Sequence, residues 1–113
     1  MHELSLCGAI ADIAMRQAGP RRVDAVHVRI GDLRQVVPGT LEFCWSMVVS
    51  GTELESAALE VERVPAVLRC LECEAQHGMA DAIAFVCACC GSVDVVVVAG
   101  EEFLVTALDL EQV

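Results

Sequence analysis

The sequence has few basic residues and no apolar run long enough to cross a bilayer. Its 113 residues include 7 Lys or Arg against 17 Asp or Glu, for a formal net charge of -10. Because phosphate contacts require clustered Lys and Arg, this balance argues against a nucleic-acid partner. The valine-rich run at residues 95–99 is far too short for a transmembrane helix, so we expect no membrane partner.

Three further motifs are missing. The first residues carry Glu3 and Asp12 early and show no basic leader before an apolar core, so we expect no secretory signal. Without a Gly-rich phosphate loop, any nucleotide hydrolysis is expected to belong to a partner. No catalytic set of side chains is visible, and we expect a protein that is not an enzyme.

The 7 cysteines, an odd number without a secretion signal, indicate a reducing cytoplasm in which thiols bind metals.

Four of these cysteines form a repeated motif. Two Cys-x-x-Cys pairs, Cys70 with Cys73 and Cys87 with Cys90, are separated by thirteen residues. Each pair offers two thiolates from one tight turn, which suits a single tetrahedral zinc ion better than two disulfides or four free thiols. The second pair runs into Gly91, where such a turn favours a residue free to adopt a positive φ. Cys89 is irregular, and a swap of Cys89 for Cys90 as ligand stays open.

Hydrophobic periodicity predicts an α+β fold. Steps of three and four predict amphipathic helices at residues 3–17 and 40–49, the second more buried, whereas alternation and valine-rich runs predict strands. The predicted strands are residues 24–30, 59–64, 83–86, 93–99 and 103–110. We therefore expect two helices packed on one face of a three-stranded sheet, with an inserted zinc-ribbon-like small β domain.

The same pattern predicts two domains. Residues 1–64, completed by the C-terminal strand in 102–113, form the α+β domain, and residues 65–101 form the inserted zinc-binding domain. An insert of this size buries too little apolar surface to fold unaided. The metal is therefore expected to supply much of its folding free energy.

The amino terminus offers a second metal site. The Met1 α-amino group, backbone amides and the His2 imidazole lie within a few bonds and can form a square-planar nitrogen-rich site, which suits nickel(II) or copper(II). Glu3 adds a carboxylate, which is also favourable at the start of a helix. Taken alone, a histidine at position two is most simply incidental.

These features together resemble the HypA family, the nickel metallochaperones of [NiFe]-hydrogenase maturation. The resemblance rests on Met1-His2-Glu3 before a helix, a strand ending in Ile30-Gly31, a second helix and the paired cysteine motif. It covers essentially the whole chain. One departure is that the family usually carries proline after the first cysteine of the second turn, where this chain has Ala88-Cys89. That departure leaves the fold intact and leaves Cys89 as the alternative to Cys90 for the fourth zinc ligand.

The resemblance implies a function. Nickel, as transferred cargo, would bind the Met1 amine, His2 and Glu3. Structural zinc would bind the four cysteines of the motif. The carrier would work with a HypB-like maturation GTPase and deliver nickel to the hydrogenase large-subunit precursor, and some members also serve urease maturation. The alternative is a zinc-ribbon protein-interaction adaptor without nickel cargo. If the first three residues are set aside, the rest of the sequence supports this adaptor almost as well.

Four other groups of residues are weaker candidates for a functional role. We expect His27 to be exposed or partly covered, and His77 to lie in a polar loop between the cysteine pairs. A metal role is the less favoured alternative for each. Cys7 and Cys44 fall on apolar helix faces and are read as small buried hydrophobes. The acidic residues of 53–62 are read as a solvated face: Glu53, Glu55, Glu60 and Glu62.

Overall fold

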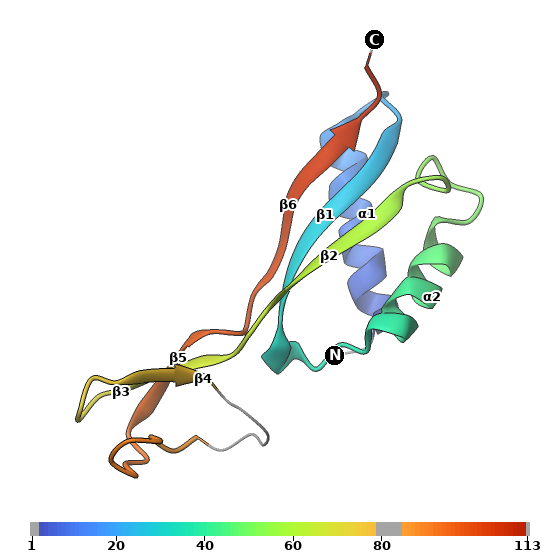
Figure 1. The fold of residues 1–113 in the computed structure, drawn as a ribbon. Coiled ribbons are helices and arrows are strands. Elements are labelled where there is room, and N and C mark those ends of the chain that lie inside the picture. Colours follow the sequence, from blue (N-terminus) through green and yellow to red (C-terminus); the bar gives the residue numbers. More distant parts are fainter. Residues whose placement is uncertain (1–2, 79–84, 113) are drawn as a thin grey trace.

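Two three-stranded sheets follow one another along an elongated molecule of 55 × 26 × 16 Å (Figure 1). This computed structural model describes residues 3–78 and 85–112. Its elements are α1 (Glu3–Ala18), β1 (Val23–Gly31), the 3₁₀ turn η1 (Asp32–Arg34), α2 (Pro38–Val49), β2 (Ala58–Val64), β3 (Val67–Cys70), β4 (Gln76–Gly78), β5 (Val95–Ala99) and β6 (Phe103–Leu110).

The larger sheet has the order β2-β1-β6, and both helices cover one of its faces (Figure 1). The central strand β1 runs parallel to β2 and antiparallel to β6. Its alternating residues Val26 and Val28 are fully buried beneath the helices, whereas His27 and Arg29 lie on the open face. The predicted α+β fold, with two helices on a three-stranded sheet, is confirmed.

Helix α1 packs against this sheet through a stripe of apolar residues at three- and four-residue steps. Leu6, Cys7, Ile10 and Ala14 are all almost completely buried. The periodicity of the sequence dictates this stripe, because these positions recur on one side of a 3.6-residue helix. The helix ends at Ala18, and Gly19 follows with φ +60°.

Helix α2 begins at Pro38, whose fixed φ and missing N–H suit the first helical position. Its inner face buries Leu41 and Trp45, and the Trp45 indole N–H donates to the Ala57 carbonyl at 3.0 Å. Phe43 and Met47 lie on the outer face and are 65% and 52% exposed. The expectation that the second helix is the more buried is therefore wrong.

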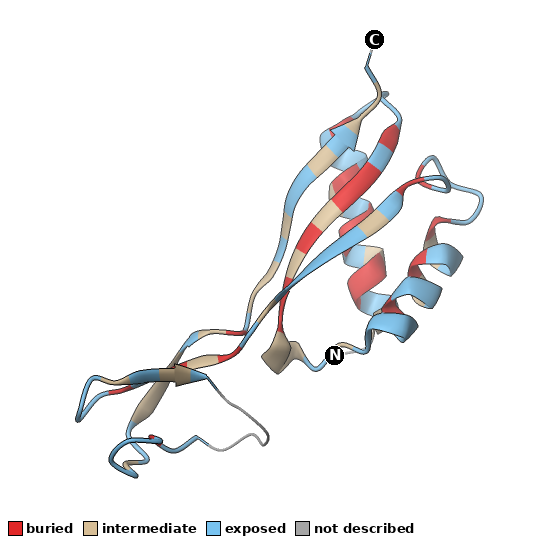
Figure 2. Ribbon diagram, viewed as in Figure 1, coloured by how far each residue is buried: buried red, intermediate tan, exposed pale blue. Residues whose placement is uncertain are grey.

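The smaller sheet has the order β4-β3-β5, with both pairings antiparallel. Figure 2 shows that most of its described residues are exposed or half-buried, in contrast to the red stripe along β1 and α1. The buried apolar residues described between positions 65 and 101 are Ala66, Leu68, Cys70 and Cys87. Two of these four are cysteines of the repeated motif, so the core of this sheet is small and depends on them.

Sequence periodicity missed parts of the smaller sheet. Strands β3 and β4 were not predicted, because three or four residues are too few to show alternation. The strand predicted at residues 83–86 is wrong at Phe85 and Val86, which lie in irregular backbone. Residues 83 and 84 lie outside the described residues. The strand predicted from residue 93 begins at Val95.

The two sheets join where the chain leaves β2 and returns to β6. Gly31 donates its N–H to the Glu102 carbonyl at 2.8 Å, and Leu33 donates to the Gly100 carbonyl at 2.8 Å. A Cβ atom at Gly31 would collide with the Gly100 carbonyl, and one at Gly100 would collide with Ala66. Glycine is therefore required here because three backbone segments approach more closely than a side chain allows.

We predict that Gly31→Ala lowers the free energy of unfolding by about 1 to 3 kcal/mol, because the added methyl group meets backbone that cannot move aside. Thermal or denaturant unfolding measures the change. The matched control is Gly8→Ala in α1, where an added Cβ meets nothing within 4 Å. This control should stabilise the protein by roughly 0.5 to 1 kcal/mol through helix propensity. Equal stability of the two variants would contradict the prediction.

Candidate metal centre

The four cysteines of the repeated motif come together at the end of the smaller sheet. The sulfurs of Cys70, Cys73, Cys87 and Cys90 all lie within 4.8 Å of one another. The Cys70 and Cys90 sulfurs are 3.6 Å apart, and those of Cys73 and Cys87 are 3.5 Å apart. A tetrahedral zinc ion with Zn–S bonds of about 2.3 Å places its sulfurs about 3.8 Å apart. These two distances match that spacing within a few tenths of an ångström, and the 4.8 Å bound on the whole set is about 1 Å wider, so the cluster suits a four-thiolate metal ion.

Each pair of cysteines sits in a turn that directs backbone N–H groups at its first sulfur. Cys70 Sγ accepts hydrogen bonds from the N–H groups of Glu72 and Cys73, both at 3.4 Å. Cys87 Sγ accepts from the N–H groups of Cys89 and Cys90, again at 3.4 Å. N–H groups placed in this way suit a metal-bound sulfur, because they stabilise the negative charge that a thiolate ligand carries.

The two turns also close in the same way. Glu74 donates its N–H to the Cys70 carbonyl at 3.0 Å, and Gly91 donates to the Cys87 carbonyl at 3.0 Å. Both closing residues have positive φ, +64° at Glu74 and +74° at Gly91. The positive φ expected at Gly91 is confirmed. The first turn reaches the same backbone conformation with a glutamate, at some cost in strain.

Hydrogen bonds within the cluster shift the pKa values of Cys87 and Cys90 in opposite directions. Backbone N–H bonds, foremost that of Cys90, lower the pKa of Cys87 to about 6. At Cys90, a hydrogen bond from the Ser92 N–H lowers the thiol pKa. Hydrogen bonds with the Cys70 and Cys87 sulfurs outweigh that effect and raise the pKa of Cys90 to about 12. Four thiolates cannot gather here without a cation to balance their charge. A divalent metal ion supplies that charge.

Cys89 is exposed and stands outside this cluster, although it follows Cys87 by only two residues. Its N–H contributes to the turn through Cys87 Sγ, while the neighbouring Cys90 supplies the fourth sulfur. The arrangement of the four sulfurs favours the spacing-based choice of Cys90, and Cys90 as ligand stays a prediction. Within residues 3–78 and 85–112, this is the single place where three or more potential metal-ligating side chains gather.

At the amino terminus, Met1 and His2 lie outside the described residues. Glu3 opens α1, and its Oε2 accepts a hydrogen bond from the Val37 N–H at 3.0 Å. This bond ties the start of α1 to the residue that precedes α2. Sequence periodicity could not reveal it, because Glu3 and Val37 are thirty-four positions apart.

The two remaining histidines have partners that the sequence did not indicate. His27 is partly covered, as expected, and its Nε2 lies 2.9 Å from Asp109 Oδ2 across the open face of the larger sheet. His77 lies in β4 rather than in the loop expected from sequence, and its Nε2 accepts the Ala88 N–H at 3.1 Å. Neither pairing has a sequence signal, because strand register and turn position create both.

The other predicted residues behave largely as expected. Cys7 is completely buried, donates to the Leu41 carbonyl at 3.4 Å, and has its pKa raised by burial to about 11, so it stays a thiol. Cys44 is half-buried against the same core. The four acidic residues read as a solvated face are all exposed: Glu53, Glu55, Glu60 and Glu62.

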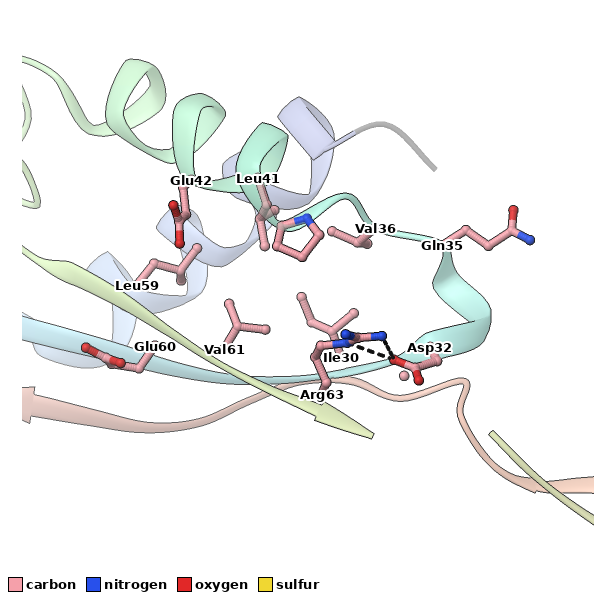
Figure 3. Close-up of a pocket in the computed structure, with 12 residues that line it drawn as sticks. Ile30, Asp32, Gln35, Val36, Leu41, Glu42, Leu59, Glu60, Val61 and Arg63 are labelled. Carbon is pink, nitrogen blue, oxygen red and sulfur yellow. Dashed lines mark hydrogen bonds and ion pairs between the residues drawn. The ribbon is translucent and has the colours of Figure 1, made fainter. Parts of the chain in front are cut away.

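A cleft of about 510 Å³ lies between α2 and the edge strand β2. Figure 3 shows the apolar side chains of Leu41, Val61 and Ile30 between the helix and the sheet. An ion pair closes one end, where Arg63 donates to Asp32 Oδ1 at 3.0 and 3.1 Å. The described residues bring no metal-ligating cluster together in this cleft.

The fold and the cluster thus define a small α+β protein with a four-cysteine metal-binding site. Residues 1–110 match the sequence model of a family described as "Hydrogenase/urease nickel incorporation, metallochaperone, hypA". The hydrogenase maturation factor HypA of Geotalea uraniireducens is 41% identical over 98% of this chain and 100% of its own length. That of Geobacter metallireducens is 40% identical over the same shares.

A solved structure is similar as well. The solution structure of the nickel metallochaperone HypA from Helicobacter pylori covers 97% of each chain with a TM-score of 0.67 at 18% identity, which supports the fold. The chain therefore belongs to the HypA family of nickel-incorporation metallochaperones, as the resemblance indicated, and it is not an enzyme. No helix among the described residues is long and apolar enough to span a membrane.

We predict that Cys90→Ser and Cys89→Ser differ sharply in zinc binding, although the two cysteines are neighbours. Cys90→Ser should weaken zinc binding at least about a hundredfold, because it removes one of four clustered sulfurs. Cys89→Ser should keep the one zinc per chain that we expect of the wild type. Competition with a chelator measures the affinity, and hydrogen exchange at Val28 in β1 checks that the larger sheet is intact. The reverse order would identify Cys89 as the ligand.

Proposed function

We propose that this protein carries nickel(II) at its amino terminus and hands it to a hydrogenase precursor. The ligands are the Met1 α-amino group, the His2 imidazole and adjacent backbone nitrogens, with the Glu3 carboxylate beside them. The single observation that carries this proposal is membership of a nickel-incorporation family in a chain that opens Met1-His2-Glu3. A carrier must release its cargo, and a site of few ligands at a chain end suits exchange.

The four-cysteine cluster has the opposite character and is proposed as a structural zinc site. Four thiolates leave no open position, which is the mark of a structural rather than a catalytic or exchangeable site. Two of the sulfurs, those of Cys70 and Cys87, are buried, and each accepts two backbone N–H groups. Zinc here supports the smaller sheet, whose apolar core is too small to fold without it.

This division of labour corresponds to a division of the chain. Residues 1–64 with 102–113 form the proposed nickel-binding domain, and residues 65–101 form the proposed zinc-binding domain. In support, the first set contributes α1, α2 and the sheet β2-β1-β6, and the second contributes β4-β3-β5.

The partners follow from what the chain lacks and from its family. We propose a HypB-like maturation GTPase, since the sequence has no phosphate-binding loop of its own, and a hydrogenase large-subunit precursor as recipient. The family description also names urease, so urease maturation is a second destination in this proposal. The place of action is the cytoplasm, where cysteines stay reduced. An adaptor without nickel cargo is less favoured, because the family is described by nickel incorporation.

We predict that His2→Ala abolishes nickel binding and leaves zinc binding unchanged, because imidazole is the one side-chain nitrogen at the amino terminus. Native mass spectrometry of untagged protein, after nickel exposure and desalting, should show one nickel and one zinc in the wild type and zinc alone in the variant. The matched control is His27→Ala, which removes a histidine from the open sheet face and should keep nickel. Full nickel binding by His2→Ala would refute the site.

A second pair of variants separates the two roles open to Glu3. Glu3→Gln keeps a side-chain oxygen for the Val37 N–H, whereas Glu3→Ala removes it. We predict that Glu3→Ala lowers the free energy of unfolding by about 1 kcal/mol relative to Glu3→Gln, since it leaves that N–H without this acceptor. If the carboxylate also binds nickel, both variants weaken nickel binding equally in calorimetric titration. Wild-type nickel affinity in Glu3→Gln would assign Glu3 to the fold alone.

A further inference from the structure

The two cysteine turns share one more feature, which concerns the residue after the first cysteine of each. Leu71 donates its N–H to the Asp94 carbonyl at 2.9 Å, and Ala88 donates its N–H to His77 Nε2 at 3.1 Å. The acceptor for the first turn lies just beyond the second turn, and the acceptor for the second turn lies in β4, just beyond the first. Each turn is therefore tied to the chain segment that follows the other.

The two ties differ in chemistry. A backbone carbonyl accepts from Leu71, and any residue at position 94 supplies one. The bond from Ala88 ends on an imidazole nitrogen, so it depends on the identity of residue 77. His77 Nδ1 lies 3.3 Å from the Gly78 carbonyl. We assign the neutral tautomer with the proton on Nδ1, because that tautomer donates to Gly78 while leaving Nε2 free to accept.

The donor also depends on the sequence. Position 88 must carry a backbone N–H for this bond to exist, and proline would remove it. The chain has alanine there, in the middle of the turn that presents Cys87 and Cys90. The bond thus joins two specific features of this chain, a histidine in β4 and a residue other than proline in the second turn.

We propose that His77 is a positioning residue for the metal site: by accepting the Ala88 N–H it holds the second cysteine turn against β4 and slows the release of bound metal. It acts without ligating the ion, since its Nε2 is occupied by the N–H. The smaller sheet has few buried apolar side chains to hold this turn in place, so a single tie carries weight. This inference rests on the proposed zinc role of the four cysteines.

The test is the rate at which zinc-loaded, full-length protein gives up its metal to an excess of a chromophoric chelator. His77→Leu removes the acceptor and should accelerate release roughly three- to tenfold, the range expected for one exposed neutral hydrogen bond. His77→Gln places an amide oxygen near the position of Nε2 and should stay within about twofold of the wild type. Rescue by glutamine distinguishes an accepting role from mere packing of the ring.

Removing the donor should have the same effect as removing the acceptor. Ala88→Pro is expected to accelerate release to a similar degree, and adding His77→Leu to it should change little, because both act on one bond. His27→Leu is the matched control, since His27 pairs with Asp109 on the larger sheet and should leave release unchanged. The absorption spectrum of the cobalt(II)-substituted protein should show four-thiolate coordination in the wild type and in His77→Gln alike.

Each outcome decides the matter. Wild-type release rates in His77→Leu would overturn the proposal, as would equal acceleration in His77→Leu and His77→Gln. A cobalt spectrum altered by His77→Gln would make His77 a ligand and also overturn it. If His77→Leu loses its fold by hydrogen exchange at β1, Ala88→Pro and His77→Gln still provide the comparison. Absence of zinc from the wild type would instead refute the structural zinc site itself, and this inference with it.

Discussion

The pairing of strand β1 with two distant segments is the constraint on which the rest of the structure depends. β2 lies parallel to β1 and β6 lies antiparallel to it, so residues 58–64 and 103–110 flank the central strand on opposite edges. Everything between them must leave and return at the same end of the sheet. Backbone hydrogen bonds from Gly31 and Leu33 mark that end, and the absence of side chains at Gly31 and Gly100 lets the segments approach.

The two sheets on either side of this junction differ in how many apolar residues they bury. The larger sheet buries a continuous apolar core with α1 and α2, whereas the smaller sheet buries four described apolar residues, of which Cys70 and Cys87 belong to the metal cluster. With the proposed structural zinc, metal binding and local folding would be one process at the smaller sheet. In the proposed division, the exchangeable nickel site belongs to the domain with the larger apolar core, and the closed zinc site belongs to the domain with the smaller one.

Sequence patterns predicted the elements whose signal is long or chemically specific. The apolar stripe of α1 and the alternation around Val26 and Val28 extend over several periods, and both appear as expected. Short elements were not predicted from the sequence. β4, for example, has three residues, Gln76–Gly78, and shows no apolar alternation. The outer face of α2 was misjudged because Phe43 and Met47 are apolar yet exposed, and periodicity alone does not say which face meets the core.

By itself, the sequence determined that the chain would form two cysteine turns and one sheet with two helices, because local spacing and periodicity act over a few residues. Only the tertiary structure decided which sulfurs gather. Cys89 and Cys90 follow Cys87 by two and three residues, yet it is the Cys90 sulfur that joins the cluster, 3.6 Å from that of Cys70. It also decided the partners of Glu3, His27 and His77, which are 34, 82 and 11 positions away. Such contacts depend on strand register and on where turns return, and these are set by the packing of the whole chain.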